Sequence, residues 1–169
     1  MRYAGEHNLT GVALYDAPRC LLRRAVARRL KRVQARLQKR GLGLKMWDCY
    51  RPISVQKRLW TLVQDARYVA RPVFRRGRPV RGSRHNRGAA IDVTLVDAQG
   101  NDVPVPTDHD DFSERAHSRY AGGSRAARKN ARLLRRAMTA EGFSPIASEW
   151  WHFDGPSWRD YPLEDRPLR

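Results

Sequence analysis

Residues 83–96 read SRHNRGAAIDVTLV. The second half of this segment is an apolar, partly β-branched run, which predicts a strand with one face against the core. The core-facing positions of the predicted strand are Ala89, Ile91, Val93 and Leu95. Asp92 would then project from the opposite face, toward a cleft.

His85 precedes Asp92 by seven residues, a separation that would span roughly 23 Å in extended chain. If both side chains serve one site, the chain must double back between them. Gly88 can adopt the positive φ that such a reversal needs, and Asn86 tolerates it better than most residues. The segment therefore predicts a turn that returns His85 to the side of Asp92.

A second segment, Glu149-Trp150-Trp151-His152, adds another imidazole and another carboxylate. Two imidazoles, a third ligand and a nearby general base are the inventory of a catalytic zinc site. Glu149 and His152 would leave a flat strand on opposite faces, so a bend or bulge is expected between them. The other histidines have no such context and are interpreted as structural; they are His7, His109 and His117.

Two further segments read YAGEHNLTG at 3–11 and LKMWDCYRP at 44–52. With S-x-H-x-x-G-x-A-x-D at 83–92 and E-x-W-H at 149–152, the chain resembles the zinc-dependent D-alanyl-D-alanine dipeptidases of the vancomycin-resistance type. The broader zinc D,D-peptidase superfamily shares the two metal segments. The Tyr-Arg-Pro at 50–52 points to the dipeptidase branch, and the resemblance covers nearly the whole chain.

The resemblance implies a metallopeptidase that hydrolyses D-Ala-D-Ala to two D-alanines by Glu-assisted attack of a zinc-bound water. It implies one zinc ion per chain and a small dipeptide as the binding partner. Seven site residues follow: His85, Asp92 and His152 as zinc ligands, Glu149 as general base and acid, Arg51 as the oxyanion partner, and Ser83 and Asp110 as substrate-binding residues.

The chemistry suits these residue types independently of the family. Zinc lowers the pKa of bound water and polarises a carbonyl. Glu149 beside that water can take its proton and pass it to the leaving amine. Arg51 can stabilise the oxyanion through charge-assisted hydrogen bonds, and removing an oxyanion donor typically costs about 3–4 kcal/mol.

The family's M-G-T-x-F-D-x-F segment is changed in this chain, where residues 105–112 read VPTDHDDF. Asp110 falls on the motif aspartate, which helps bind the substrate's amino group. Val105 and Pro106 stand where the motif has methionine and glycine, and His109 stands where it has phenylalanine. The rival enzyme is a zinc D,D- or L,D-carboxypeptidase acting on peptidoglycan stem peptides, which would leave the side of Asp110 open.

The chain of 169 residues, 41% of them hydrophobic, predicts one domain over residues 1–169 with a substantial core. It has no apolar run long enough to span a membrane and no apolar signal region after Met1. The expected compartment is cytoplasmic if Met1 is the native start, and periplasmic or secreted if an export signal was removed.

Helical and strand patterns alternate irregularly, which predicts the α+β class: a small, mainly antiparallel sheet, about three amphipathic helices, and a zinc site in a cleft at the sheet. The middle helix should bury Val55, Leu59, Leu62 and Val63. Pro-rich segments at 72–82 and 104–106 are expected to be loops. The helices are predicted at about 20–40, after Pro52, and from Ser124 to Gly142, and the strands at 42–50, 89–96 and 148–154.

The formal net charge of +17 raises a second hypothesis, a basic nucleic-acid-binding module. Of the 34 basic residues, 29 are arginines, and they are spread along the chain without a nucleic-acid motif. No specific nucleic-acid partner is therefore expected. Cys20 and Cys49 are open to two interpretations: two buried thiols, or a disulfide that ties the first helix to the strand before Arg51 and indicates an oxidising compartment.

Overall fold

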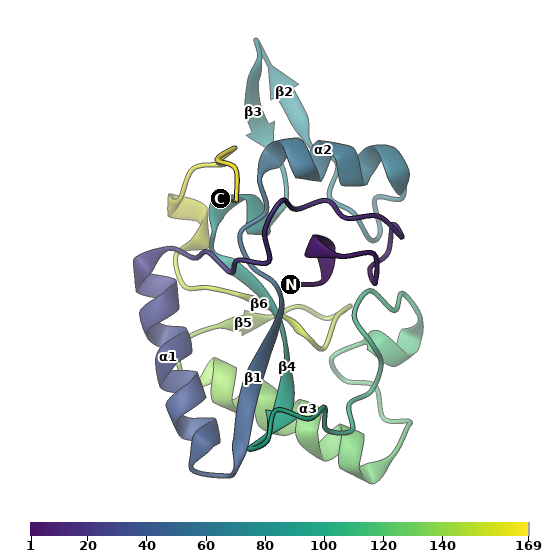
Figure 1. Ribbon diagram of the computed structural model, residues 1–169, viewed down its shortest axis with the longest axis vertical. Helices are drawn as coiled ribbons and strands as arrows, with labels where there is room; N and C mark the ends of the chain where they lie inside the picture. Colours follow the sequence, from purple (N-terminus) through teal and green to yellow (C-terminus); the bar gives the residue numbers. More distant parts are fainter. Residues whose placement is uncertain (169) are drawn as a thin grey trace.

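A four-stranded antiparallel sheet lies at the centre of the computed structural model, which describes residues 1–168 (Figure 1). The strand order is β1-β4-β6-β5. The strands are β1 (Leu42–Asp48), β4 (Ala90–Asp97), β5 (Ser144–Pro145) and β6 (His152–Asp154). The predicted α+β class with a mainly antiparallel sheet is confirmed. The last strand is shorter than expected, because residues 147–151 bend before β6 begins.

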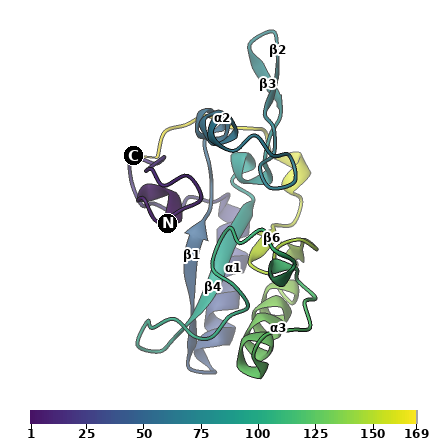
Figure 2. The same cartoon turned by 90° about the vertical axis from the view of Figure 1, so that its right-hand side faces the viewer.

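Two long helices, α1 (Arg24–Gln38) and α3 (Arg125–Thr139), cover one face of the sheet (Figure 2). Helix α3 begins as predicted, since the Ser124 hydroxyl accepts the Ala127 N–H at 3.0 Å, a cap worth about 1 kcal/mol. Helix α1 starts four residues later than predicted. Arg23 has an extended backbone and donates its N–H to the Gly88 carbonyl instead of entering the helix.

The third helix, α2 (Ile53–Leu62), follows Pro52 as predicted but buries a different face. Ile53, Gln56 and Leu59 are its buried residues, whereas Leu62 is 52% exposed. The prediction that Leu62 faces inward is therefore wrong. The inward row includes a polar residue, Gln56, which binds the Arg51 guanidinium, and apolar periodicity alone does not detect such a position.

The Pro-rich segment at 72–82 is a β-hairpin, not the expected loop. Strands β2 (Val73–Arg75) and β3 (Arg78–Arg81) pair around a turn at Arg76 and Gly77. Both turn residues have positive φ, 50° and 74°, as tight two-residue hairpin turns require. The hairpin projects from the end of the molecule that carries α2 (Figures 1 and 2).

The main core lies between the sheet and the two long helices. Its central members are Val33, Ile91, Leu134, Met138, Trp151 and Phe153. Strand β4 is buried on both faces over residues 90–95, so the expectation that one of its faces is open to a cleft holds only near Asp92, which lines a cavity described below. Burial of β4 on both faces fixes the position of Asp92 firmly.

Cys20 and Cys49 form a disulfide, which decides the question that the sequence left open. The bond joins the segment before α1 to the residue directly after β1. Cross-linking two residues that are 29 positions apart lowers the entropy of the unfolded chain and thereby stabilises the folded state by about 3–4 kcal/mol. Disulfides of this kind are typical of oxidising compartments.

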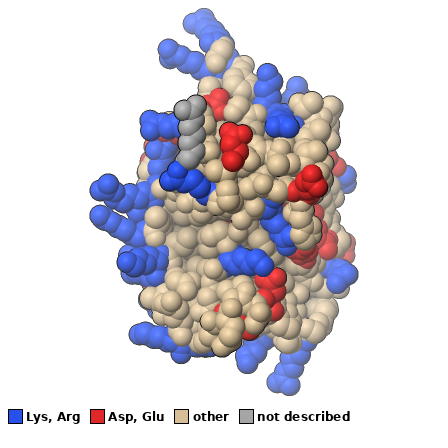
Figure 3. All heavy atoms as spheres, in the orientation of Figure 1, with Lys and Arg blue, Asp and Glu red and all other residues tan. Residues whose placement is uncertain are grey.

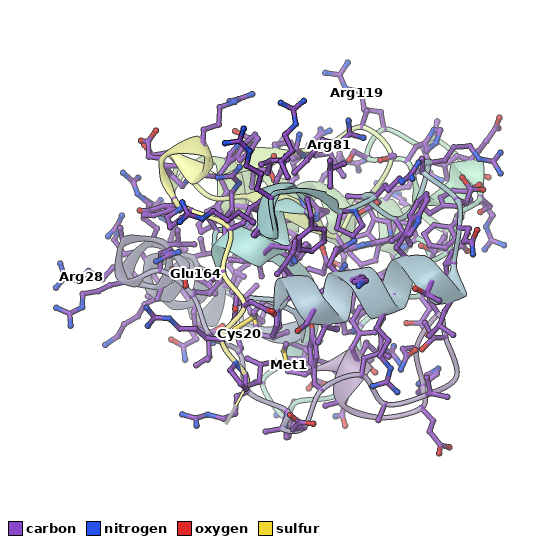
Figure 4. All side chains as sticks on the ribbon, turned by 90° about the horizontal axis from the view of Figure 1, so that it is seen from above. Met1, Cys20, Arg28, Arg81, Arg119 and Glu164 are labelled. Carbon is purple, nitrogen blue, oxygen red and sulfur yellow. A yellow bond between two sulfur atoms is a disulfide. The ribbon has the colours of Figure 1, made fainter. Side chains whose placement is uncertain are left out.

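Many basic side chains extend from the outline of the face seen in Figure 3, and Arg28, Arg81 and Arg119 point outward (Figure 4). Helices α1 and α3 together carry twelve basic and no acidic residues. A hollow of about 920 Å³ between the two helices is lined by six cations and by no acid or histidine. Within residues 1–168 no helix is both long and apolar enough for a membrane span.

Candidate active site

A single row of the sheet places three site residues side by side. The pairing of β1 with β4 shifts by one residue between Met46 and Asp48, so that Asp48 lies opposite Asp92. Asp92 in turn lies opposite His152 on β6. Directly paired residues project from the same face of a sheet. The β-bulge therefore directs all three side chains to one point, an alignment that the sequence pattern does not reveal.

The reversal predicted between His85 and Asp92 is a short 3-10 turn, η2 (Arg84–Arg87). Ser83 caps this turn: its hydroxyl accepts the His85 N–H, and its own N–H donates to the Asn86 side chain at 2.7 Å. Gly88 ends the turn with φ +65°, as predicted. Asn86 contributes by capping and by donating to the Arg51 carbonyl at 2.8 Å, not by a positive φ.

Each imidazole of the pair is oriented by a partner on its outer nitrogen. His85 Nδ1 donates to the Cys49 carbonyl at 2.7 Å, and His152 Nε2 donates to Asp154 Oδ1 at 3.0 Å. Asp154 is itself paired with Arg84 at 3.0 Å. These bonds leave His85 Nε2 and His152 Nδ1 directed inward, in the arrangement by which proteins prepare histidines to bind a metal.

The inner atoms converge on one point. His85 Nε2 lies 3.2 Å from His152 Nδ1, and Asp92 Oδ1 lies 3.4 Å from the first and 2.9 Å from the second. Tetrahedral zinc with ligands at about 2.0–2.1 Å separates its ligand atoms by roughly 3.3 Å. The donor set of His85, Asp92 and His152 therefore fits a zinc ion in both spacing and chemistry.

The buried histidines and carboxylates of the cluster shift each other's pKa values. Burial opposes a charge on His152, but hydrogen bonds with Asp154 and Asp92 raise its pKa to about 10. Burial likewise opposes the charge on Asp92, whose pKa nevertheless lies well below its ordinary value because His85, His109 and His152 surround it. The cluster therefore stabilises a positive charge at the point where its inner atoms meet. A metal ion must compete with a proton for His152 Nδ1.

A cavity of about 460 Å³ opens beside this cluster. All seven predicted site residues line it: Arg51, Ser83, His85, Asp92, Asp110, Glu149 and His152. The chain bends before β6, as the spacing requires, and Glu149 Oε2 lies 3.8 Å from His152 Nδ1. Burial is the main cause that raises the pKa of Glu149, and the charges of Asp92 and Asp110 add to it. A carboxylate with a raised pKa is a better proton acceptor.

Arg51 is buried and held from two sides. Its Nε and Nη2 donate to Asp48 Oδ2 at 3.0 and 2.6 Å, and its Nη1 donates to Gln56 at 2.9 Å. A guanidinium has five N–H groups, so two remain for a ligand in the cavity that Arg51 lines. The guanidinium also lies 5.0 Å from the ring centroid of Tyr3.

Asp110 approaches the cavity from the loop between β4 and α3, with a positive φ of 57°. The Tyr3 hydroxyl donates to Asp110 Oδ2 at 2.8 Å. Burial and the nearby Asp110 raise the pKa of Tyr3, so the hydroxyl keeps its proton for this bond. The amino-terminal segment therefore helps to build the site.

Four residues of the site are missed by sequence reasoning. Asp48 accepts hydrogen bonds from Arg51, and Asp154 accepts one from His152, but the sequence assigns neither carboxylate a role. Tyr3 lies within a segment that resembles the family, but it too has no assigned role. His109, interpreted as structural from its sequence context, lies 3.2 Å from Asp92 Oδ2. One signal in the sequence indicates a role for His109: it directly precedes Asp110, at the position where the family motif has phenylalanine.

Comparison with known proteins finds a matching family and several similar proteins. A family described as D-ala-D-ala dipeptidase matches residues 1–166. A D-alanyl-D-alanine dipeptidase of Escherichia coli K12 is 39% identical over 163 residues, covering 96% of this chain and 81% of that protein. A protein of the same name from Streptomyces coelicolor is 34% identical and covers 90% of this chain and 82% of its own length. Another from Enterococcus faecium is 30% identical and covers 96% of this chain and 91% of its own length.

Proposed function

The chain belongs to the D-Ala-D-Ala dipeptidase family of metallopeptidases, and from this premise we propose that it hydrolyses D-Ala-D-Ala to two D-alanines with one zinc ion. The observation that carries the proposal is the convergence of His85 Nε2, Asp92 Oδ1 and His152 Nδ1 at the wall of a cavity that Glu149 also lines. We propose further that residues 1–169 act as one catalytic domain.

His85, Asp92 and His152 would hold the zinc ion. When bound there, zinc supplies Lewis acidity, which lowers the pKa of water and polarises a carbonyl oxygen. The chain orients the two imidazole ligands through the Cys49 carbonyl and the Asp154 carboxylate. Such outer hydrogen bonds fix the tautomer of each histidine and raise its basicity.

Glu149 moves the proton in this proposal. Its carboxylate takes a proton from the attacking water and delivers it to the nitrogen of the leaving D-alanine. Burial raises the pKa of Glu149, which makes its carboxylate a better acceptor for the proton of the attacking water. Its side chain is 20% exposed, so it retains access to the cavity.

The remaining residues bind and orient the substrate. The two uncommitted N–H groups of Arg51 stabilise the oxyanion that develops on the carbonyl oxygen. Asp110 accepts hydrogen bonds from the substrate's ammonium group, which a dipeptide carries next to the scissile bond. Ser83 lines the cavity, although its hydroxyl also accepts the His85 N–H and so serves the turn as well.

The test compares two substrates on the zinc-loaded protein: free D-Ala-D-Ala and an acylated tripeptide that ends in D-Ala-D-Ala. Release of D-alanine is measured for each. The proposal expects rapid release from the free dipeptide and little from the tripeptide. The reverse preference would identify a carboxypeptidase that uses the same metal site, and release from neither would overturn the peptidase assignment.

A further inference from the structure

His109 is a buried imidazole between two carboxylates of the site. Its side chain is 2% exposed, and its ring packs against Trp47 and Trp151 at centroid distances of 5.2 and 5.7 Å. An apolar aromatic ring would fill this space equally well. Burying polar nitrogens costs free energy unless they form hydrogen bonds. The contacts of the two nitrogens therefore indicate what the histidine contributes beyond packing.

Nε2 of His109 lies 3.2 Å from Asp92 Oδ2. A carboxylate oxygen only accepts hydrogen bonds, so the ring donates in this contact. The other oxygen of the same carboxylate, Oδ1, is the atom that faces His85 and His152. His109 therefore holds the carboxylate by its far oxygen, and this contact determines which oxygen is presented to the two imidazoles.

The other nitrogen of His109 faces the substrate side. Nδ1 lies 3.3 Å from Asp110 Oδ2, the oxygen that also accepts the Tyr3 hydroxyl. Nδ1 has no well-directed hydrogen bond to any of residues 1–168. Asp110 itself follows His109 with a positive φ of 57°, a conformation that aspartate tolerates better than most residues. The ring thus lies between Asp92 and Asp110 and spaces them.

We propose that His109 is a positioning residue that holds Asp92 as a one-oxygen metal ligand and links this ligand to the loop that presents Asp110. The first part concerns metal binding alone. The second part rests on the proposed function, because it assigns Asp110 to the substrate's ammonium group. The two parts are carried by different nitrogens of the ring, and two separate measurements, zinc affinity and substrate preference, test them.

Three substitutions divide the contributions. His109→Phe keeps an aromatic ring against Trp47 and Trp151 and removes both nitrogens. His109→Gln places an amide N–H near the position of Nε2, whereas His109→Asn places one near Nδ1. His117→Phe is the matched control, because the same change is made at an exposed histidine that does not line the cavity.

The zinc affinity of the folded protein is measured by competition with a chromophoric chelator, and thermal unfolding of each apo variant is recorded alongside. Loss of an outer hydrogen bond to a metal ligand typically costs 10–100-fold in affinity. We expect that loss for His109→Phe and His109→Asn, and an affinity close to wild type for His109→Gln and His117→Phe.

The proposal is overturned if His109→Phe binds zinc as tightly as wild type, since packing would then be the whole role of the ring. If His109→Phe fails to fold, the contrast between Gln and Asn still decides, and equal affinities in those two variants reject the Nε2 contact. This readout needs no substrate, so it stands even if the proposed hydrolysis of D-Ala-D-Ala fails.

The link to Asp110 is read from substrate preference at saturating zinc. We expect His109→Phe to raise KM for free D-Ala-D-Ala while leaving KM for the N-acetylated dipeptide unchanged, because a displaced Asp110 affects the unblocked amine alone. An equal rise for both substrates would reject the link. If wild type cleaves neither dipeptide, the proposed function fails and the zinc measurement alone judges His109.

Discussion

His85 Nε2 and His152 Nδ1 face each other at 3.2 Å, while the other nitrogen of each ring is bound to a fixed oxygen acceptor. Two imidazole lone pairs at this distance repel unless a cation lies between them. The carboxylate of Asp92 completes the requirement, because its Oδ1 approaches the same point. The local structure is therefore prepared for a metal by residues that do not themselves bind it.

Removing one imidazole should remove the metal. We expect His152→Ala to lose stoichiometric zinc while retaining most of the fold, since β6 keeps its pairing with β4. Elemental analysis after dialysis measures the metal, and circular dichroism measures the fold. His7→Ala is the control, because His7 is exposed. One tightly held zinc per chain in His152→Ala would contradict the ligand assignment.

Glu149 should be separable from metal binding. Glu149→Gln keeps the shape of the side chain and removes its basicity, so turnover of D-Ala-D-Ala should fall by about 10²–10⁴-fold while zinc is retained. Steady-state kinetics and metal analysis on the same preparation test both expectations. Near-normal turnover would show that another group accepts the proton.

Arg51 should matter for both stability and catalysis. An ammonium group cannot reproduce the planar fork that holds Asp48 and Gln56 together. We expect Arg51→Lys to lower kcat by about 10²–10³-fold and to lower the unfolding temperature, because Asp48 is fully buried. Kinetics and thermal unfolding are measured together. Full activity with reduced stability would restrict Arg51 to a structural role.

The sequence predicts the cluster of His85, Asp92 and His152 better than it predicts the residues around that cluster. His85, Asp92 and His152 are identifiable because metal chemistry restricts residue types, and Gly88 marks the turn that brings two of them together. Asp48 cannot be found in this way, because its place opposite Asp92 depends on a one-residue shift in strand pairing. Such a shift depends on tertiary packing, which local sequence patterns do not report.

The fold divides along the same lines. Helix α3 was predictable because its apolar period and its Ser124 cap agree. The exposure of Leu62 and the burial of Gln56 in α2 were not predictable, because the inward row is selected by the Arg51 guanidinium. The hairpin at 72–82 escaped prediction because its proline and arginine content is atypical of strands, whereas its turn conformation decides its structure.

Glu141 gives a pH dependence of stability. Hydrogen bonds from Arg32 and Arg36 on α1 lower its pKa below the ordinary 4.5. A carboxylate whose pKa is lower in the folded state stabilises the protein above its unfolded pKa, and this contribution is lost as pH falls through the folded value. We expect Glu141→Gln to unfold at a lower temperature than wild type at pH 7, and the difference to shrink as the pH falls below 4.5.

Calorimetry across this pH range measures the effect. Arg28→Gln is the control, because Arg28 lies on α1 with Arg32 and Arg36 but points into solvent (Figure 4). A difference between Glu141→Gln and wild type that stays constant with pH would show that the carboxylate's charge does not contribute.

Asp110 should determine the preference for an unblocked substrate. A carboxylate placed to receive an ammonium group favours a free amino terminus, because an unpaired buried charge is costly. We expect N-acetyl-D-Ala-D-Ala to be cleaved at least ~100-fold less efficiently than free D-Ala-D-Ala, which corresponds to roughly 2.7 kcal/mol of lost transition-state stabilisation.

Asp110→Asn should narrow this gap, because it should lower kcat/KM for the free dipeptide selectively. The Tyr3 hydroxyl, which donates to Asp110 at 2.8 Å, can donate equally to an asparagine oxygen, so the loop should keep its position. The values of kcat/KM for both substrates and both proteins provide the test. Equal rates of wild type on the free and acetylated substrates would reject the dipeptidase assignment and favour the carboxypeptidase.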